Sequence, residues 1–258
     1  MLYGYLAVEG PTDVEFVGRL LRASGLRRVQ NAYEVDDLWR ILIPNEYPPG
    51  GDLLKRVPVP GFFRSDTHSV AVESAGGLDR LVPAVQDTRS QLFPRWEEVV
   101  ALGLMADADQ ETPPDRFQRL RNALQEIGMP VPVSVPGEIS DGRPRLGIYV
   151  FPDNLRQGTL EDLLGECAAK VYPGLLDGAR TFVGGVDRTV LTQEDVEEAA
   201  KPSGEIKATL ACIAGFLVAG GTLQVSVARN RWLRDDALAL DNIAAVHTFL
   251  KHLLGLNA

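Results

Sequence analysis

Residues 99–105, with the sequence VVALGLM, constrain the fold most strongly. They are apolar almost throughout and are followed closely by two carboxylates, Asp107 and Asp109. A run without alternation between apolar and polar residues is typical of a central parallel strand that helices cover on both faces. The sequence therefore predicts an α/β fold built on a buried parallel sheet.

The beginning of the chain has the same strand-then-helix form. Residues 2–8 are apolar and aromatic, which indicates a buried strand that stops at Glu9. We expect a helix to follow, with Thr12 as its N-cap, Glu15 as the capping-box partner and Gly25 at its end.

Strands and helices alternate through the first two thirds of the chain. This order implies a mostly parallel sheet with right-handed crossovers, in which ligands bind beyond the carboxyl ends of the strands. The further strands expected are 70–72, 146–151 and, as a short one, 131–135. The helices expected run through Leu78, Leu81 and Val85, from Thr112 and Pro113 to Gly128, from Thr159 onward, and near 193–201, 204–219 and 234–254.

We interpret residues 1–258 as one domain. Its core covers about 1–170 and is interrupted by an insertion at 28–68, and a helical extension covers about 190–258. Residues 44–68 hold five prolines and three glycines, so the insertion is expected to be extended, with little regular structure other than short strands.

The charge composition of the chain narrows the classes of function that it fits. The chain has 26 basic and 35 acidic residues, a net charge of −9, which argues against a broad basic surface that coats nucleic acid. An enzyme that meets phosphates through metal ions remains compatible, because the metals supply the positive charge.

Cellular location is inferred from cysteines and apolar runs. Cys167 and Cys212 form no CxxC pair, so neither a zinc site nor a disulfide framework is suggested. No signal peptide is apparent at the N-terminus, and residues 208–221 are too short and glycine-rich to span a bilayer. We expect a cytoplasmic protein without a membrane segment.

Three carboxylates follow two of the predicted strands. Glu9 ends the first strand, and Asp107 and Asp109 end the strand at 99–105, so all three are expected at one edge of the sheet. Such carboxylates repel one another unless a cation lies between them, and Mg²⁺ takes carboxylate oxygens while keeping waters that a phosphate can displace. The alternative is a surface turn for Glu9 and helix capping for the aspartates.

Two of these segments resemble Toprim domains. Residues 8–13 (VEGPTD), followed by a helix, resemble the first Toprim motif, and residues 107–109 (DAD), after an apolar strand, resemble the second. The resemblance implies a Toprim-like fold, Mg²⁺ binding by Glu9, Asp107 and Asp109, and a role for Glu9 in acid–base chemistry.

The similarity is greatest to the overcoming-lysogenization-defect nucleases and to small stand-alone Toprim proteins. Residues 72–77 resemble the second-strand turn of this branch, and residues 151–164 resemble its later acidic element. Leu78 stands where relatives often have lysine. No GxxxxGK[ST] motif is present, so nucleotide-driven regulation does not carry over.

Three further residues are secondary candidates. Asp13 and Glu161 lie in the first turns of helices, where a negative charge is favourable in any protein, and the resembling nucleases imply that they bind a second metal. Lys207 begins a helix and could neutralise charge on a phosphate during catalysis; the alternative is a solvated lysine.

The resulting hypothesis is hydrolysis of nucleic-acid phosphodiester bonds that depends on Mg²⁺, with Mn²⁺ as a possible substitute. Glu9 and Lys207 are the candidate catalytic residues, and no organic cofactor is indicated. The alternative is a Toprim-fold module that binds metal and a phosphate ligand or a partner protein without cutting. A topoisomerase is not expected, because it needs a nucleophilic tyrosine on a separate strand-gating domain, and 258 residues are too few to hold that domain as well.

Overall fold

The computed structural model describes residues 1–46 and 59–256. A six-stranded sheet has the order β2-β3-β4-β1-β5-β6. The four strands β4, β1, β5 and β6 are parallel, and β3 and β2 extend the sheet antiparallel at one edge. The predicted α/β class with a mostly parallel sheet is confirmed. The strands are β1 Leu2–Val8, β2 Arg27–Arg28, β3 Gly61–Arg64, β4 His68–Ser74, β5 Val99–Asp107 and β6 Arg145–Phe151.

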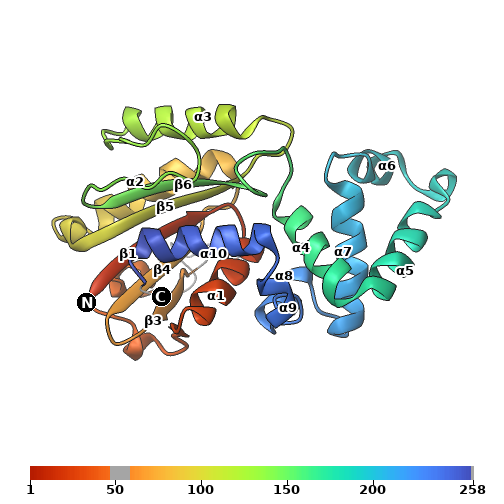
Figure 1. Ribbon diagram of the computed structural model, residues 1–258, viewed down its shortest axis with the longest axis horizontal. Helices are drawn as coiled ribbons and strands as arrows, with labels where there is room; N and C mark the ends of the chain where they lie inside the picture. The colour runs from red at the N-terminus through yellow and green to blue at the C-terminus, as the bar shows by residue number, and fades with distance from the viewer. Residues whose placement is uncertain (47–58, 257–258) are drawn as a thin grey trace.

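Helices cover both faces of this sheet (Figure 1). Helices α1 and α10 lie on one face, and α2 and α3 lie on the other. The fully buried side chains of β5 supply both cores, as its apolar sequence predicted. The helices are α1 Pro11–Ala23, α2 Leu81–Gln91, α3 Pro113–Glu126, α4 Leu160–Val171, α5 Pro173–Gly184, α6 Gln193–Ala199, α7 Gly204–Leu217, α8 Leu223–Ala228, α9 Asp235–Leu238 and α10 Asp241–Leu254.

The last helix, α10, packs closely on β5 and β6. Two glycines make this approach possible. A Cβ at Gly103 would lie 2.7 Å from Leu253, and one at Gly147 would lie 2.8 Å from Phe249. The end of the chain, which the sequence pattern grouped with the helical extension, therefore covers the sheet.

Helices α4 to α7 form a lobe that projects beside the sheet (Figure 1). Leu163 and Leu164 of α4 pack in one buried cluster with Leu210 and Ile213 of α7. Helix α5 was not among the expected elements. In the described part of the chain, no helix has the length and apolar character needed to cross a bilayer.

Part of the predicted insertion belongs to the sheet. Residues 61–64 form β3, which pairs with β4 from Gly61↔Val72 to Arg64↔Ser69. Residues 47–58, which belong to the same predicted insertion, lie outside the described residues. A short strand of the kind allowed for in this insertion is therefore present at its C-terminal end, where Phe62 and Phe63 are buried.

Two local predictions were wrong. The N-cap of α1 is Gly10, and Thr12 lies inside the helix; the Asp13 carboxylate accepts the Gly10 amide at 3.1 Å and so replaces the expected cap. Residues 131–135 form no strand, although Val131 and Val133 are buried against the sheet. By contrast, Thr112 and Thr159 are N-caps as predicted.

Candidate metal centre

Glu9 and Asp107 meet at the carboxyl edge of the sheet. Strands β1 and β5 are parallel neighbours with Val8 beside Met105, so the residues that follow them share this edge. The backbone amide of Asp107 donates to Glu9 Oε1 at 2.8 Å. The predicted convergence of these two strand ends is therefore present in the fold.

Asp13 lies one turn after Glu9, in the first turn of α1. Its Oδ2 accepts the Gly10 amide, whereas its Oδ1 is buried and has no hydrogen-bond partner among the described residues. The side chain is only 7% exposed. Burial, followed by repulsion from Glu9, raises the pKa of Asp13 to about 7. A buried carboxylate oxygen without a donor is costly unless a proton or cation meets it.

Asp107 is directed at the start of α4. Its Oδ1 accepts the backbone amide of Leu160 at 2.8 Å, an interaction that a helix N-terminus offers to anions. Burial nevertheless raises the pKa of Asp107 well above its ordinary value, and the charges of Asp13, Glu9 and Glu161 raise it further. These four carboxylates therefore act on one another electrostatically.

The pKa of Glu9 is also raised, mainly by burial. The hydrogen bond from Asp107 opposes this rise, and the nearby charge of Asp109 adds to it. Positive charge on Arg116 and Lys207 acts in the opposite direction. Burial and the charge of Asp109 thus outweigh the contacts that favour the ionised Glu9 carboxylate.

Asp109 departs from the geometry that the sequence suggested. The two aspartates were expected to point the same way in an extended chain, but β5 ends at Asp107 and Asp109 has a φ of +52°. Its backbone pairs instead with Gly158, and its Oδ2 accepts Arg116 Nη2 at 3.0 Å. The extended-chain argument was therefore wrong at this residue.

Arg116 is a buried cation that was not among the predicted site residues. It is 3% exposed, and its Nη2 also donates to the carbonyl oxygen of Ala108 at 3.0 Å. A signal was present in the sequence, because Arg116 precedes Leu120 and Leu124 at intervals of four and so lies on the buried side of α3. An arginine in such a stripe needs a carboxylate partner.

Glu161 and Lys207 face each other across the lobe. Lys207 Nζ of α7 lies 3.9 Å from Glu161 Oε1 of α4, and the lysine side chain is 54% exposed. Because Glu161 raises the pKa of both Asp13 and Asp107, and Lys207 lowers that of Glu9, both residues lie near the strand ends. The fold therefore brings the two secondary candidates to the same region.

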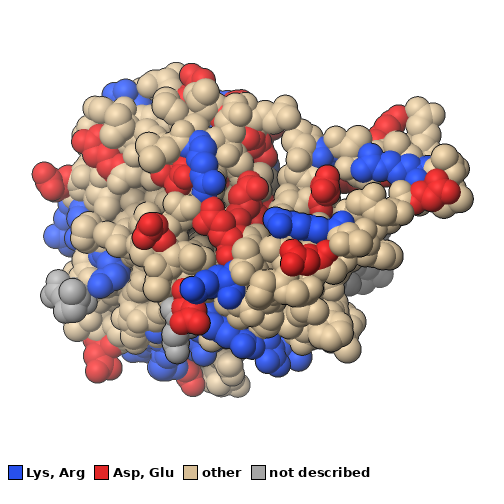
Figure 2. Space-filling model, turned by 45° about the vertical axis from the view of Figure 1, so that its right-hand side comes forward, with Lys and Arg blue, Asp and Glu red and all other residues tan. Residues whose placement is uncertain are grey.

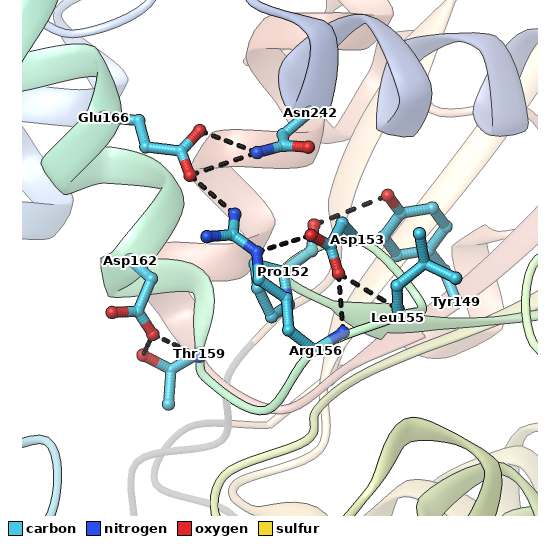
Figure 3. Close-up of polar contacts among 9 residues, drawn as sticks. All are labelled: Tyr149, Pro152, Asp153, Leu155, Arg156, Thr159, Asp162, Glu166 and Asn242. Atoms are coloured by element: carbon cyan, nitrogen blue, oxygen red, sulfur yellow. Dashed lines mark hydrogen bonds and ion pairs between the residues drawn. The ribbon is translucent and has the colours of Figure 1, made fainter.

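A polar network holds the segment that leads into α4 (Figure 3). Arg156 pairs with Asp153 and with Glu166, and Asn242 of α10 donates to both oxygens of Glu166. The Asp162 carboxylate accepts the Thr159 amide at 2.7 Å and completes the cap of α4. These contacts fix the helix start that donates to Asp107.

We refer to Glu9, Asp13, Asp107 and Glu161 as the acidic centre. Acidic side chains gather in the middle of the face shown in Figure 2, close to the helical lobe. With the side chains as they stand, no group of three or more His, Cys, Asp or Glu residues within 1–46 and 59–256 is arranged to hold a metal ion. Asp109 turns to Arg116, and Glu161 turns to Lys207.

Comparison with known proteins adds a family and a fold. A family model described as "Protein of unknown function (DUF3226)" matches residues 3–254. The chain is similar to the crystal structure of hypothetical protein PH0156 from Pyrococcus horikoshii OT3, with a TM-score of 0.52 and 18% identity. That match covers 98% of this chain and 95% of the other, so the whole fold is shared. A search of curated proteins finds no match.

Proposed function

The chain belongs to the DUF3226 family, a family of unknown function, and we propose that it is a Toprim-type nuclease that hydrolyses phosphodiester bonds at the acidic centre with the help of Mg²⁺. One observation carries this proposal. Glu9 directly after β1, Asp13 of α1 and Asp107 at the end of β5 converge: the charge of Glu9 raises the pKa of Asp13, and the charges of both raise that of Asp107. In addition, Asp13 Oδ1 is buried without a partner among the described residues.

The chemistry of these side chains suits a divalent cation, although no three of them in the described residues are arranged to hold one as they stand. Burial and mutual repulsion make the metal-free carboxylates unfavourable as anions, and a cation would relieve both costs. Carboxylate oxygens are the ligands that Mg²⁺ prefers, and the partnerless Oδ1 of Asp13 offers one. When bound, such an ion polarises the phosphate and lowers the pKa of a bound water.

We assign Glu9, Asp13 and Asp107 as the principal metal ligands. Asp109 and Glu161 are further ligands, although each is paired with a cationic side chain in the structure. Because Mg²⁺ keeps several of its waters, these two carboxylates can act through water without leaving their partners. Glu9 acts either as a metal ligand or as the general base that accepts a proton from the attacking water, the acid–base role that the Toprim resemblance implies.

We assign Lys207 to contact the phosphate of the substrate. Its ammonium group is half-exposed beside Glu161 and is free to reach an oxygen of a bound phosphodiester. A positive charge there stabilises the additional negative charge of the transition state.

A second candidate is a non-cutting module that binds metal and a phosphate ligand or partner protein. The ion pair between Asp109 and Arg116 favours it, because that pair ties up the second carboxylate of the DAD segment. The net charge of −9 favours it as well, since it repels nucleic acid.

Cleavage assays separate the two candidates. The purified protein is incubated with single- and double-stranded DNA and RNA, with Mg²⁺, Mn²⁺ or a chelator. We expect cleavage when Mg²⁺ or Mn²⁺ is present and none with the chelator. The cleavage rate of Glu9→Gln should be at least about 100-fold lower than that of the wild type, as for removal of a general base. Glu126→Gln, a change of the same kind on the exposed end of α3, is the matched control and should cut normally.

An intact substrate in every metal condition, with metal binding retained, would favour the non-cutting module. Equal cleavage by Glu9→Gln and wild type would contradict the assignment of Glu9.

A further inference from the structure

A groove lined by arginines lies at the far end of α1 from Asp13. Its walls are Arg22 in the last turn of α1, residues 26–30 around β2, and Ala228 at the end of α8. It encloses about 730 Å³. We call it the arginine groove, because Arg22, Arg27 and Arg28 all line it.

The groove carries positive charge that the described residues do not fully neutralise. Within 1–46 and 59–256, Arg22 makes no ion pair, and neither does Arg229, which follows the groove residue Ala228. Arg27 pairs with Glu34 at 2.8 Å but its side chain remains 59% exposed, and Arg28 pairs with Glu15. Guanidinium donors therefore remain available to a ligand.

A second observation reinforces this charge. Arg19 lies one turn before Arg22, and its Nε is buried without a hydrogen-bond partner among the described residues. Burial and the charge of Arg22 lower the pKa of Arg19, so these two cations lie close together. Arg19 does not line the groove, so it adds to the positive charge near Arg22 but supplies no donor to a ligand there.

The chemistry of the groove fits phosphate. A guanidinium group presents a planar fork of donors that matches two oxygens of one phosphate. In a chain with a net charge of −9, a strand of phosphates needs a local positive surface to approach the acidic centre. Lys and Arg side chains gather below the central acidic group in Figure 2.

The groove is connected to the acidic centre through α1. Asp13 and Arg22 are nine residues apart on this helix, which corresponds to about 14 Å along its axis and about half a turn around it, so they lie on opposite faces of α1. Arg28 reaches Glu15, only two residues after Asp13, so the basic side chains extend back toward the start of the helix. A strand that passes from Asp13 to Arg22 must therefore cover more than about 14 Å, the rise of roughly four nucleotides of one strand.

We propose that the arginine groove binds the phosphodiester backbone of a nucleic acid a few nucleotides away from the phosphate held at the acidic centre. This inference rests on the proposed function, because it assigns the substrate path of the same site. The contacts are to phosphates and carry no base specificity, so DNA and RNA are both accommodated.

Binding of labelled DNA and RNA oligonucleotides, single-stranded and duplex, is measured by fluorescence anisotropy over a range of salt, with chelator present. We expect Arg22→Ala/Arg27→Ala to weaken binding at least about tenfold at low salt. The slope of log affinity against log salt should fall by about 0.7 per lost contact for a single strand and by about 0.9 for a duplex. Arg143→Ala, an exposed arginine before β6 at the opposite edge of the sheet, is the control.

Equal affinity and salt slope in the groove variant and in Arg143→Ala would overturn the inference, and so would a wild-type protein that binds none of the oligonucleotides at low salt. Binding that depends on the groove, without cleavage in any metal, would leave the inference standing and defeat the nuclease proposal. Cleavage with the same KM in wild type and the groove variant would defeat the inference alone.

Discussion

The backbone amide of Asp107 donates to the carboxylate of Glu9 at 2.8 Å, across 98 positions of sequence. This contact joins the ends of β1 and β5 and orients the glutamate by one of its oxygens. The second oxygen, Oε2, accepts no hydrogen bond from the described residues and can meet a cation.

Metal-free protein should lose stability as the pH rises from about 4 to about 7. The Asp13 pKa is about 7 in the folded protein against an ordinary value of 3.8, because of burial and repulsion from Glu9. In this interval the folded state binds more protons than the unfolded state, so the free energy of unfolding falls with pH. Urea denaturation at a series of pH values, with chelator present, measures this free energy of unfolding.

The raised pKa values of Glu9 and Asp107 likewise lower the free energy of unfolding as the pH rises. Asp13→Asn keeps an oxygen that can accept the Gly10 amide and removes the titrating group, so it should reduce the decline. A stability that rises over this interval, or a decline that Asp13→Asn leaves unchanged, would contradict the account.

Mg²⁺ should raise the melting temperature of the wild-type protein, because an ion that binds only the folded state stabilises it by mass action. Asp107→Asn/Asp109→Asn should abolish the rise. Differential scanning calorimetry over a range of Mg²⁺ concentrations measures both. A shift of unchanged size in the double variant would mean that the ion binds elsewhere.

Lys207→Ala should slow cleavage at saturating substrate by about tenfold or more, since the ammonium group is assigned to the charge of the transition state. Mg²⁺ binding, measured by calorimetric titration, should remain. Lys201→Ala, which removes an exposed lysine of the same lobe, is the control. Unchanged turnover in Lys207→Ala would leave this lysine only its ion pair with Glu161.

Arg116→Met should destabilise the protein by about 1–3 kcal/mol, because the buried carbonyl oxygen of Ala108 and the Asp109 carboxylate lose their donor. Urea denaturation gives the difference. Arg119→Met on the same helix removes a half-exposed partner of Glu111 and should cost less than about 1 kcal/mol. Equal losses in the two variants would contradict the structural role of Arg116.

The edge of the sheet at which the site lies was predictable from local sequence. The apolar run at 99–105 and the strand at 2–8 each end at a carboxylate, and parallel strands bring such ends together. The geometry of Asp109 was not predictable in this way. Its left-handed φ follows from a bridge to Gly158, which lies on a separate segment of the chain.

Other features depended on packing between distant segments. The position of α10 is set by glycines in β5 and β6 that admit Leu253 and Phe249, and its own apolar pattern fits a lobe helix equally well. The position of the α1 cap depends on which side chain bonds to the backbone at the helix start. Here the Asp13 carboxylate accepts the Gly10 amide, and Thr12 is not the cap. The helical period of apolar residues and the capping propensities of single residues do not determine which side chain makes this bond.

The central claim is that the acidic centre binds a divalent cation. A crystal of the protein soaked in Mn²⁺, with X-ray data collected at the manganese absorption edge, tests it directly. We predict an anomalous peak bounded by the carboxylates of Glu9, Asp13 and Asp107. A peak at any other position, or no peak among these carboxylates at saturating Mn²⁺, would contradict the account.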